Sequence, residues 1–317
     1  LEWCINRKLV MNEINENQDH LHDEIDLKKL FNTLWSSKLT IILTTLISLM
    51  ISLGTALYLP NVYKSEALLS VNNEGNDSLS SLRGLSGLAG IAGVSLPDAE
   101  TDKSNKGIEV LKSRKLFKEF VNTNNVLVPL MAANGWDEKS NSLKIDSNLY
   151  DIEQAKWVRN AKPPRGVIPS LQEAHEEFLK LLSISKNRET GLITIGIKHF
   201  SPNIAKIWIE ELIYLVNKTI KDEDVAKAER SITYLKEQIN NTQLDELQAQ
   251  FFELIQAQTE TVMLAKATPE YLFSIIDPPV APELKSEPNR LIIVFIGSFI
   301  GFILAIFFVL MRDFIKR

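Results

Sequence analysis

Residues 291–311 read LIIVFIGSFIGFILAIFFVLM, a run of 21 residues without a charged side chain. An α-helix rises about 1.5 Å per residue, so this run extends about 32 Å and matches the hydrocarbon thickness of a bilayer. Residues 39–59, LTIILTTLISLMISLGTALYL, form a second uncharged run of the same length. A cleaved signal peptide has a shorter leader and a shorter apolar core than this first run. We therefore expect two transmembrane helices, at 39–59 and 291–311.

Basic side chains lie next to both runs, on the side away from the long segment between them. They are Lys28, Lys29, Lys38, Arg312, Lys316 and Arg317. Tails rich in Lys and Arg stay on the cytoplasmic side of a membrane, whereas long segments are exempt from this count. We therefore expect both termini in the cytoplasm and residues 60–290 outside it.

The segment between the two runs is long enough to bury its own core. Residues 60–290 carry 27 Lys and Arg and 32 Asp and Glu, without a basic block that would indicate a nucleic-acid partner. Cys4 is the only cysteine of the chain and precedes the first run, so no disulfide is expected in this segment.

The first ten residues are left out of the fold expectation. The chain begins with Leu1, whereas Met11 opens a plausible tail. A non-standard start codon, or a start placed too early, would explain this beginning.

Residues 60–200 mix strand and helix patterns and predict an α/β base domain. The expected elements are a strand over 62–71, a helix over 106–122 and an irregular stretch over 134–169. A further helix is expected to start at Ser170 as its N-cap, with Glu173 completing a capping box. A β-hairpin that turns at Gly191 is expected over 182–199. Residues 271–276 are expected to return to the sheet as its last strand.

Residues 201–267 carry the longest helical pattern of the chain. Pro202 follows Ser201, a good N-cap residue, and marks the start of a helix. Residues 204–216 are apolar around most of the helix and are expected to be buried in the base. A charged stretch then leads to an expected tip at 240–242, after which apolar residues three and four apart predict a coiled-coil return. The expected seam of this return helix is Leu244, Leu247, Phe251, Leu254, Gln258, Val262 and Ala265. We therefore expect a long antiparallel helical hairpin.

No motif predicts catalysis, a cofactor or a metal. GLSGLAGIAG, residues 84–93, is followed by Val94-Ser95-Leu96, whereas a phosphate-binding loop requires Lys directly after its last glycine. His175 lies in a stretch, EAHEE, that we expect to face solvent, and no second histidine follows four residues later. His20 and His22 lie in a polar tail, and no Ser/His/Asp set can be assembled near His199. We expect a protein that is not an enzyme.

Two local patterns mark candidate functional residues next to the second apolar run. Gly297 and Gly301 form GxxxG, which lets helices approach closely in lipid. Pro279, Pro282 and Pro288 lie in DPPVAPELKSEPNR, residues 277–290. Proline favours extended polyproline II, so this stretch is expected to be a semi-rigid spacer between the last strand and the membrane. The alternative is a linker that only interrupts regular structure.

The chain resembles the Wzz-type chain-length determinants, the class 1 polysaccharide co-polymerases of Gram-negative inner membranes. The segments that carry the resemblance are EIDLKKLFNTLW (24–35), YKSEALLSV (63–71), GLAGIAG (87–93), WVRNAKPPRGVIPSLQEA (157–174), TGLITIGIKHFSP (190–202) and VMLA (262–265). The family's proline-rich pattern falls on Pro279, Pro282 and Pro288, whereas Glu287 and Asn289 replace its Ser and Lys. Ala305 replaces a later glycine.

The resemblance implies a function as well as a fold. The protein would regulate the modal chain length of a lipid-linked surface polysaccharide, such as the O-antigen of lipopolysaccharide. It would form a homo-oligomeric ring in the bacterial inner membrane and act with a separate membrane polymerase, possessing no cofactor of its own. The growing lipid-linked glycan is a further expected partner. The glycan, its length and the number of subunits do not follow from the sequence.

The implied architecture is an α+β membrane protein in which two transmembrane helices flank a periplasmic α/β base domain with a protruding antiparallel helical hairpin. The expected parts are a cytoplasmic tail (1–38), a transmembrane helix (39–59), the base domain (60–200), the hairpin (201–267), the last strand and proline-rich spacer (268–290), a second transmembrane helix (291–311) and a cytoplasmic tail (312–317).

Two other functions use similar architectures. An adaptor for capsule or exopolysaccharide export would work with a separately encoded tyrosine autokinase, and a neighbouring kinase gene would indicate it. A chemoreceptor-like sensor would need a long cytoplasmic signalling helix, which the sequence does not contain.

Overall fold

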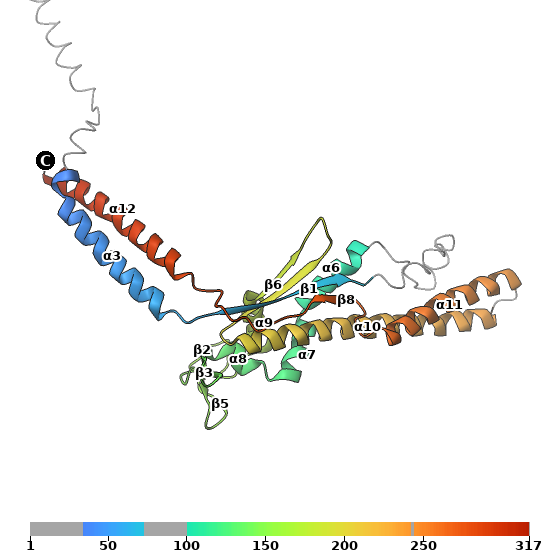
Figure 1. Cartoon of the computed structure of the whole chain (residues 1–317). Coiled ribbons are helices and arrows are strands. Elements are labelled where there is room, and N and C mark those ends of the chain that lie inside the picture. Colours follow the sequence, from blue (N-terminus) through green and yellow to red (C-terminus); the bar gives the residue numbers. More distant parts are fainter. Residues whose placement is uncertain (1–33, 73–99, 242–243, 317) are drawn as a thin grey trace, which may run out of the picture. The chain divides into compact units, whose positions relative to one another are not determined.

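A computed structural model describes residues 34–72, 100–241 and 244–316 (Figure 1). The chain divides into two compact units. One unit contains the residues before Pro60 and from Pro288 onward, and the other contains residues 60–287. Cys4, His20, His22, the stretch 84–93 and Thr242 lie outside the described residues.

The first unit consists of two apolar helices that pack against each other, α3 (Lys38–Tyr58) and α12 (Arg290–Lys316). Both helices are long and apolar enough to cross a membrane, over Lys38–Tyr58 and Arg290–Asp313. The helices expected at 39–59 and 291–311 are therefore present. Most side chains on both helices are exposed, as lipid-facing side chains of a spanning pair would be.

A four-stranded antiparallel sheet organises the second unit, with strand order β6-β7-β1-β8. Its strands are β1 (Tyr63–Val71), β6 (Leu182–Lys186), β7 (Ile193–His199) and β8 (Phe273–Asp277). Tyr63 pairs with His199 at one end of β1, and Leu69 pairs with Ile193 toward the other. The strand near 62–71 and the hairpin that turns at Gly191, whose φ is +73°, are confirmed.

Helices cover one face of this sheet and form the core with it. They are α6 (Glu100–Leu111), α7 (Arg114–Asn124), α8 (Leu127–Met131), α9 (Leu171–Leu181) and the first part of α10 (Pro202–Asn241). Phe120 is fully buried between Phe178 and Trp208, with ring centroids 5.7 Å from each. Burial of one such side chain contributes about 1.5–3 kcal/mol. The expected burial of 204–216 is confirmed, although Ile207 and Tyr214 remain exposed.

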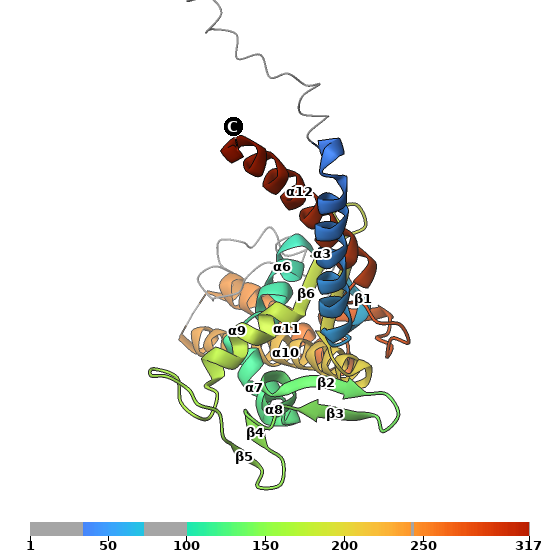
Figure 2. The same cartoon turned by 90° about the vertical axis from the view of Figure 1, so that its left-hand side faces the viewer.

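Two stretches differ from expectation. The helix expected over 106–122 is two helices, because the hydroxyl of Ser113 accepts a hydrogen bond from the N–H of Leu116 and starts α7 anew. The stretch over 134–169 contains two short antiparallel ribbons beside α8 (Figure 2). The ribbons pair β2 (Ala133–Asp137) with β3 (Ser142–Ile145) and β4 (Tyr150–Asp151) with β5 (Lys156–Trp157).

His175 does not face solvent, so that expectation was wrong. Its ring is buried on α9, packs against Phe117 at 5.2 Å and lies 2.8 Å from the carbonyl of Lys112 through Nε2. The acidic neighbours in EAHEE indicated an exposed helix face, but His175 lies on the buried side of α9 together with Ala174 and Phe178. Ser170 caps α9 as expected, since its hydroxyl accepts from the N–H of Glu173.

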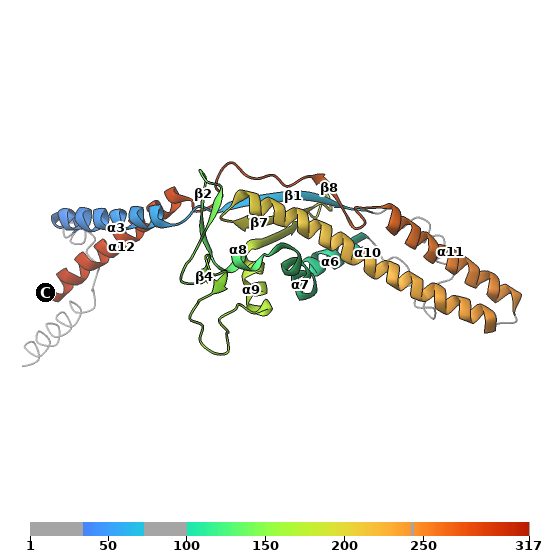
Figure 3. The ribbon, with the colours of Figure 1, turned by 90° about the horizontal axis from the view of Figure 1, so that it is seen from below.

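The far part of α10 packs side by side with α11 (Asp245–Ala267), beyond the sheet (Figure 3). Among the described residues of this helical pair, Leu235 and Leu254 form the buried apolar cluster, with Phe251 and Ile255 packed against them. The other buried positions on this seam are small or polar, namely Ala228, Ser231, Ala257, Gln258 and Ala265. Leu244, at the start of the return helix, is 64% exposed and lies outside the seam.

Candidate functional site

The proline-rich segment continues from β8 and runs back along the open edge of β1. The hydroxyl of Ser65 donates to the carbonyl of Val280 at 2.7 Å. Near residue 287, the N–H of Val62 donates to the carbonyl of Glu287 at 2.9 Å, and the N–H of Ser286 donates to the carbonyl of Val62 at 2.8 Å. The segment expected as a semi-rigid spacer is, up to Glu287, docked on the sheet.

The physical reason lies in where β8 ends. Asp277 pairs with Leu68, so β8 leaves the first residues of β1 without a regular partner on that side. The following segment covers this edge, but proline has no N–H to donate to a ladder. Its hydrogen bonds therefore come only from residues between the prolines.

The three prolines lie in different surroundings. Pro279 is buried, whereas Pro282 and Pro288 are half-buried. Glu287, which stands where the family pattern has Ser, forms an ion pair of 2.5 Å with Lys198 on β7. Because both side chains are partly exposed, this pair contributes at most about 1 kcal/mol.

The glycine face of α12 lies against α3 of the same chain. A Cβ atom on Gly297 would overlap the side chain of Ser52, and one on Gly301 would overlap that of Ser48. The hydroxyl of Ser48 donates to the carbonyl of Gly297, and that of Ser52 to the carbonyl of Ile293, both at 2.8 Å. The glycines therefore allow a close approach between the two helices of one chain.

Sequence reasoning missed the serines. Ser48 and Ser52 are four residues apart, the same spacing as Gly297 and Gly301. Small residues on one helix and hydroxyls on the other, at equal spacing, are typical of close helix pairs in lipid. The signal was present in the first apolar run.

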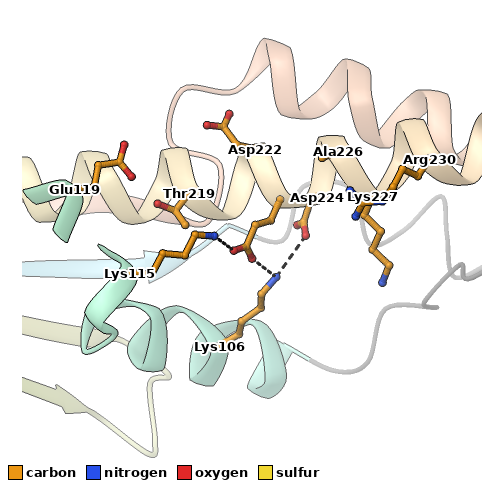
Figure 4. A pocket seen from close by; sticks show the side chains of 10 residues that line it. Lys106, Lys115, Glu119, Thr219, Asp222, Asp224, Ala226, Lys227 and Arg230 are labelled. Carbon is orange, nitrogen blue, oxygen red and sulfur yellow. Dashed lines mark hydrogen bonds and ion pairs between the residues drawn. The ribbon is translucent and has the colours of Figure 1, made fainter. Parts of the chain in front are cut away.

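A cleft of about 520 Å³ lies between α10 and the helices α6 and α7 (Figure 4). Lys115 of α7 lies 2.7 Å from Glu223 of α10, and this hydrogen bond lowers the pKa of the Glu223 carboxyl. Lys106 of α6 lies 3.7 Å from Glu223 and 3.5 Å from Asp224. The charges in the cleft compensate one another, and the cleft therefore joins three helices rather than presenting a reactive group.

The root of the helical pair contains a second polar joint that the sequence did not reveal. Asn217 is buried on α10, and its side-chain oxygen accepts from the N–H groups of Leu272 and Phe273, both at 2.8 Å. Its side-chain nitrogen donates to the carbonyl of Phe273 at 2.9 Å. The phenol of Tyr271 donates to Asp224 at 3.1 Å, and burial, followed by the charge of Asp224, raises its pKa. These bonds fix the return of α11 into β8.

The histidines and acids of the described chain do not assemble a reaction centre. His199 is buried between the carbonyl of Pro129 and the N–H of Ser201, and burial lowers its pKa. Among the described residues, no group of three or more His, Cys, Asp or Glu could hold a metal ion. The described residues form paired apolar helices, a sheet-and-helix base and a long helical pair.

One family model matches the first part of the chain. Residues 23–123 match the family described as "Chain length determinant protein", Wzz. The resemblance to Wzz-type chain-length determinants is therefore confirmed over this part of the chain. No curated protein matches the chain.

Two solved structures show a loose likeness. A "full-length bacterial polysaccharide co-polymerase" is 13% identical with a TM-score of 0.39, covering 93% of this chain and 98% of that one. A "Fragment of WzzB, Polysaccharide Co-polymerase from Salmonella Typhimurium" is 11% identical with a TM-score of 0.31, covering 72% of this chain and 100% of the fragment. Scores this low support no inference.

Proposed function

We propose that this protein regulates the modal chain length of a lipid-linked surface polysaccharide, such as the O-antigen of lipopolysaccharide. The observation that carries the proposal is the match of residues 23–123 to the chain-length determinant family. In this role the protein is not an enzyme. A separate membrane polymerase adds the repeat units, and this protein acts on that polymerase as a homo-oligomeric ring.

The proposed topology places both termini in the cytoplasm and residues 60–287 in the periplasm. Its support is the pair of helices, α3 and α12, that are apolar and long enough to span, together with the basic residues at their outer ends. In this arrangement the helical pair of α10 and α11 protrudes from the base as a hairpin. Alkaline phosphatase fused after Glu189 should be active, because this enzyme folds only outside the cytoplasm. A fusion after Arg312 should be inactive.

The proline-rich segment and the glycine face would connect the base to the membrane in this function. Pro279, Pro282 and Pro288 limit the bending of the segment that leaves β8, and Gly297 and Gly301 hold α12 against α3. We propose that this connection transmits the state of the periplasmic ring to the part of the protein that meets the polymerase.

A comparison of glycan ladders tests the function. The gene is deleted in its own bacterium, and surface polysaccharide is separated by gel electrophoresis beside a strain complemented with the wild-type chain. We expect the deletion to lose the modal band and the complemented strain to regain it. An unchanged ladder in the deletion strain would exclude the proposed function. A loss of all surface polysaccharide would instead support the export adaptor.

A further inference from the structure

Residues 154–172, here called the basic loop, differ in charge from the rest of the second unit. The segment includes β5 and extends into the first turn of α9, and it reads QAKWVRNAKPPRGVIPSLQ, with four basic residues and no acidic one. Residues 60–290 together carry five more acidic than basic side chains. Lys156, Lys162 and Arg165 are exposed, so their charges face the surroundings.

The basic loop also holds apolar side chains outward. Val167 is 51% exposed and Ile168 is 66% exposed, directly after the exposed Arg165 and Gly166. Val158 and Leu171 are exposed as well. Apolar side chains gathered on one exposed segment mark an interaction surface more often than scattered ones do.

A buried ion pair fixes this arrangement. Arg159 donates from both terminal nitrogens to the two carboxylate oxygens of Glu173, at 2.6 and 2.7 Å. The same guanidinium donates to the carbonyls of Val167, at 2.9 Å, and of Gly166, at 2.8 Å. The side chains of Arg159 and Glu173 are only 11% and 10% exposed. Bidentate charged hydrogen bonds are the strongest kind in proteins, so Arg159 is held firmly on Glu173 and in turn holds the backbone at Gly166 and Val167.

The ribbon β2–β3, which precedes the loop in the chain, contacts the first residue of β1. Trp136 of β2 packs edge-on against Tyr63, the first residue of β1, with ring centroids 5.4 Å apart. The ribbons β2–β3 and β4–β5 lie at this end of the unit (Figure 1). Only four residues separate Tyr58, the end of α3, from Tyr63, so these two residues stay within about 17 Å of each other at about 3.5 Å per residue. This bound holds at any angle between the two units.

Basic and apolar side chains side by side fit one partner chemistry in particular. The interface of an anionic bilayer attracts Lys and Arg to its phosphate groups and accepts apolar side chains just below them. An acidic protein surface would satisfy the cations but would leave Val167 and Ile168 in water. An apolar protein surface would cover the apolar residues and strand the cations.

We propose that the basic loop is a membrane-contact element that binds anionic phospholipid headgroups through Lys156, Lys162 and Arg165 while Val167 and Ile168 enter the interface. The contact supports the base beside the membrane at a third point, in addition to the two chain connections to α3 and α12. The inference rests on the part of the proposed function that has α3 and α12 crossing a membrane.

The first experiment measures the depth of the loop in lipid. The full chain carries Cys4→Ser and Ile168→Cys, labelled with an environment-sensitive fluorophore, in nanodiscs of phosphatidylcholine with or without phosphatidylglycerol. A nitroxide on the lipid headgroup serves as the quencher. We expect strong quenching in anionic nanodiscs and weaker quenching in neutral ones. The control label, Glu189→Cys, lies in the exposed β6–β7 turn at the far end of the sheet and should be quenched in neither.

The second experiment removes charge. Lys162→Gln with Arg165→Gln should lower the ratio of docked to undocked loop about fivefold for each basic side chain removed. The matched control removes Arg188 and Lys236 in the same way, both exposed and outside the loop, and should leave quenching unchanged. High salt should weaken docking of the wild-type loop, because exposed charges are screened.

Three results would overturn the inference. The label on residue 168 could remain solvent-accessible in anionic nanodiscs. The extent of quenching could also be the same whatever the lipid charge and with or without the two substitutions. The label could also be protected from water only when the oligomer is intact, whatever the lipid, in which case a second copy of the chain covers the loop. These measurements do not involve the glycan. The proposed lipid contact can therefore be disproved while the proposed chain-length control is supported, and chain-length control can be disproved while the lipid contact is supported.

Discussion

The base and the helical pair of the second unit share the long helix α10, but the side chains buried in the two regions differ in kind. Where α10 passes the sheet, it contacts Phe120 through Trp208, within one continuous core of large apolar side chains. Beyond the sheet, the same helix meets α11 through Leu235 and Leu254 and otherwise through small or polar residues. Cooperative stability follows buried apolar area, so the base should remain folded under conditions in which the helical pair opens.

The two regions meet at a polar root rather than through a shared apolar core. Asn217 binds the start of β8, and the ion pairs of Glu223 and Asp224 tie α10 to α6 and α7. Buried, fully bonded polar groups specify a geometry more than they add stability. The comparison therefore teaches that the base supplies stability, whereas the root supplies the direction of the helical pair.

The largest expected effect is in the base. Phe120→Ala should lower the free energy of unfolding of residues 60–287 by about 3–5 kcal/mol, because it empties a fully buried aromatic site. Phe252→Ala is the matched control on α11, where the ring is 58% exposed, and should change stability by no more than about 0.5 kcal/mol. Denaturant titration followed by far-UV circular dichroism measures both. Similar losses for the two variants would contradict the contrast between the regions.

Leu254→Ala tests whether the helical pair opens separately. Removal of one of two buried leucines should cost the pair about 2–5 kcal/mol and speed hydrogen exchange in α11 and the outer half of α10. Amides of β7 should exchange as in the wild type. Met263→Ala, on the exposed side of α11, is the control. If β7 is deprotected together with α11, the two regions unfold as one.

Asn217→Ala addresses the root. The substitution leaves two N–H groups and one carbonyl without their buried partner, so we expect a loss of about 2–4 kcal/mol. Exchange should rise at residues 268–277, while the core helix α7 stays protected. Asn203→Ala, at an exposed position of the same helix, removes an amide that bonds only to Asn141 and is the control. If the variant keeps wild-type hydrogen-exchange protection at residues 268–277, Asn217 does not stabilise this joint.

The paired helices α3 and α12 extend the comparison to a third interior. Gly297→Leu with Gly301→Leu should separate α12 from α3, at a cost of about 1–3 kcal/mol from overpacking. We also expect weaker self-association or a changed glycan ladder. Cross-linking of cysteines placed on α3 and α12 measures the separation. The control, Ile300→Leu, lies on an exposed side of α12. Unchanged cross-linking, oligomer mass and glycan ladder would exclude a role for this face.

The prolines should affect stability mainly through the unfolded chain. Pro279, Pro282 and Pro288 changed together to Ala should cost about 1–3 kcal/mol, because each proline restricts the unfolded chain, whereas the hydrogen bonds of the segment come from other residues. Glycans should nevertheless become shorter or broader in distribution at normal protein level. Leu284→Ala, on an exposed side chain of the same segment, is the control. A wild-type ladder from the triple variant would show that the segment is only a tether.

The sequence predicted what depends on local pattern. The two apolar helices, the turn at Gly191, the cap at Ser170 and the start of α10 at Pro202 all follow from residues close together in the chain. The resemblance to chain-length determinants likewise came from short motifs.

What the sequence did not predict depends on distant partners. His175 is buried because Lys112 and Phe117 lie across from it, and the proline-rich segment is docked because β8 ends early. Asn217 reads as an ordinary polar residue of a charged helix until β8 is placed beside it. Periodicity therefore gave wrong expectations in two situations. One is a polar residue within a regular helical pattern, and the other is a sheet edge that a short strand leaves open.

The pairing of Val62 with Glu287 determines how late in synthesis the sheet can be completed. The two residues are 225 positions apart in the chain, so the first strand is made long before the segment that covers its edge. At about 5–20 residues per second, roughly 10–45 s pass between them. During that interval β1 has no β8, and the sheet cannot be completed. Closure of the sheet should therefore coincide with the emergence of α12, which makes insertion of the second helix and completion of the base a single late event in biogenesis.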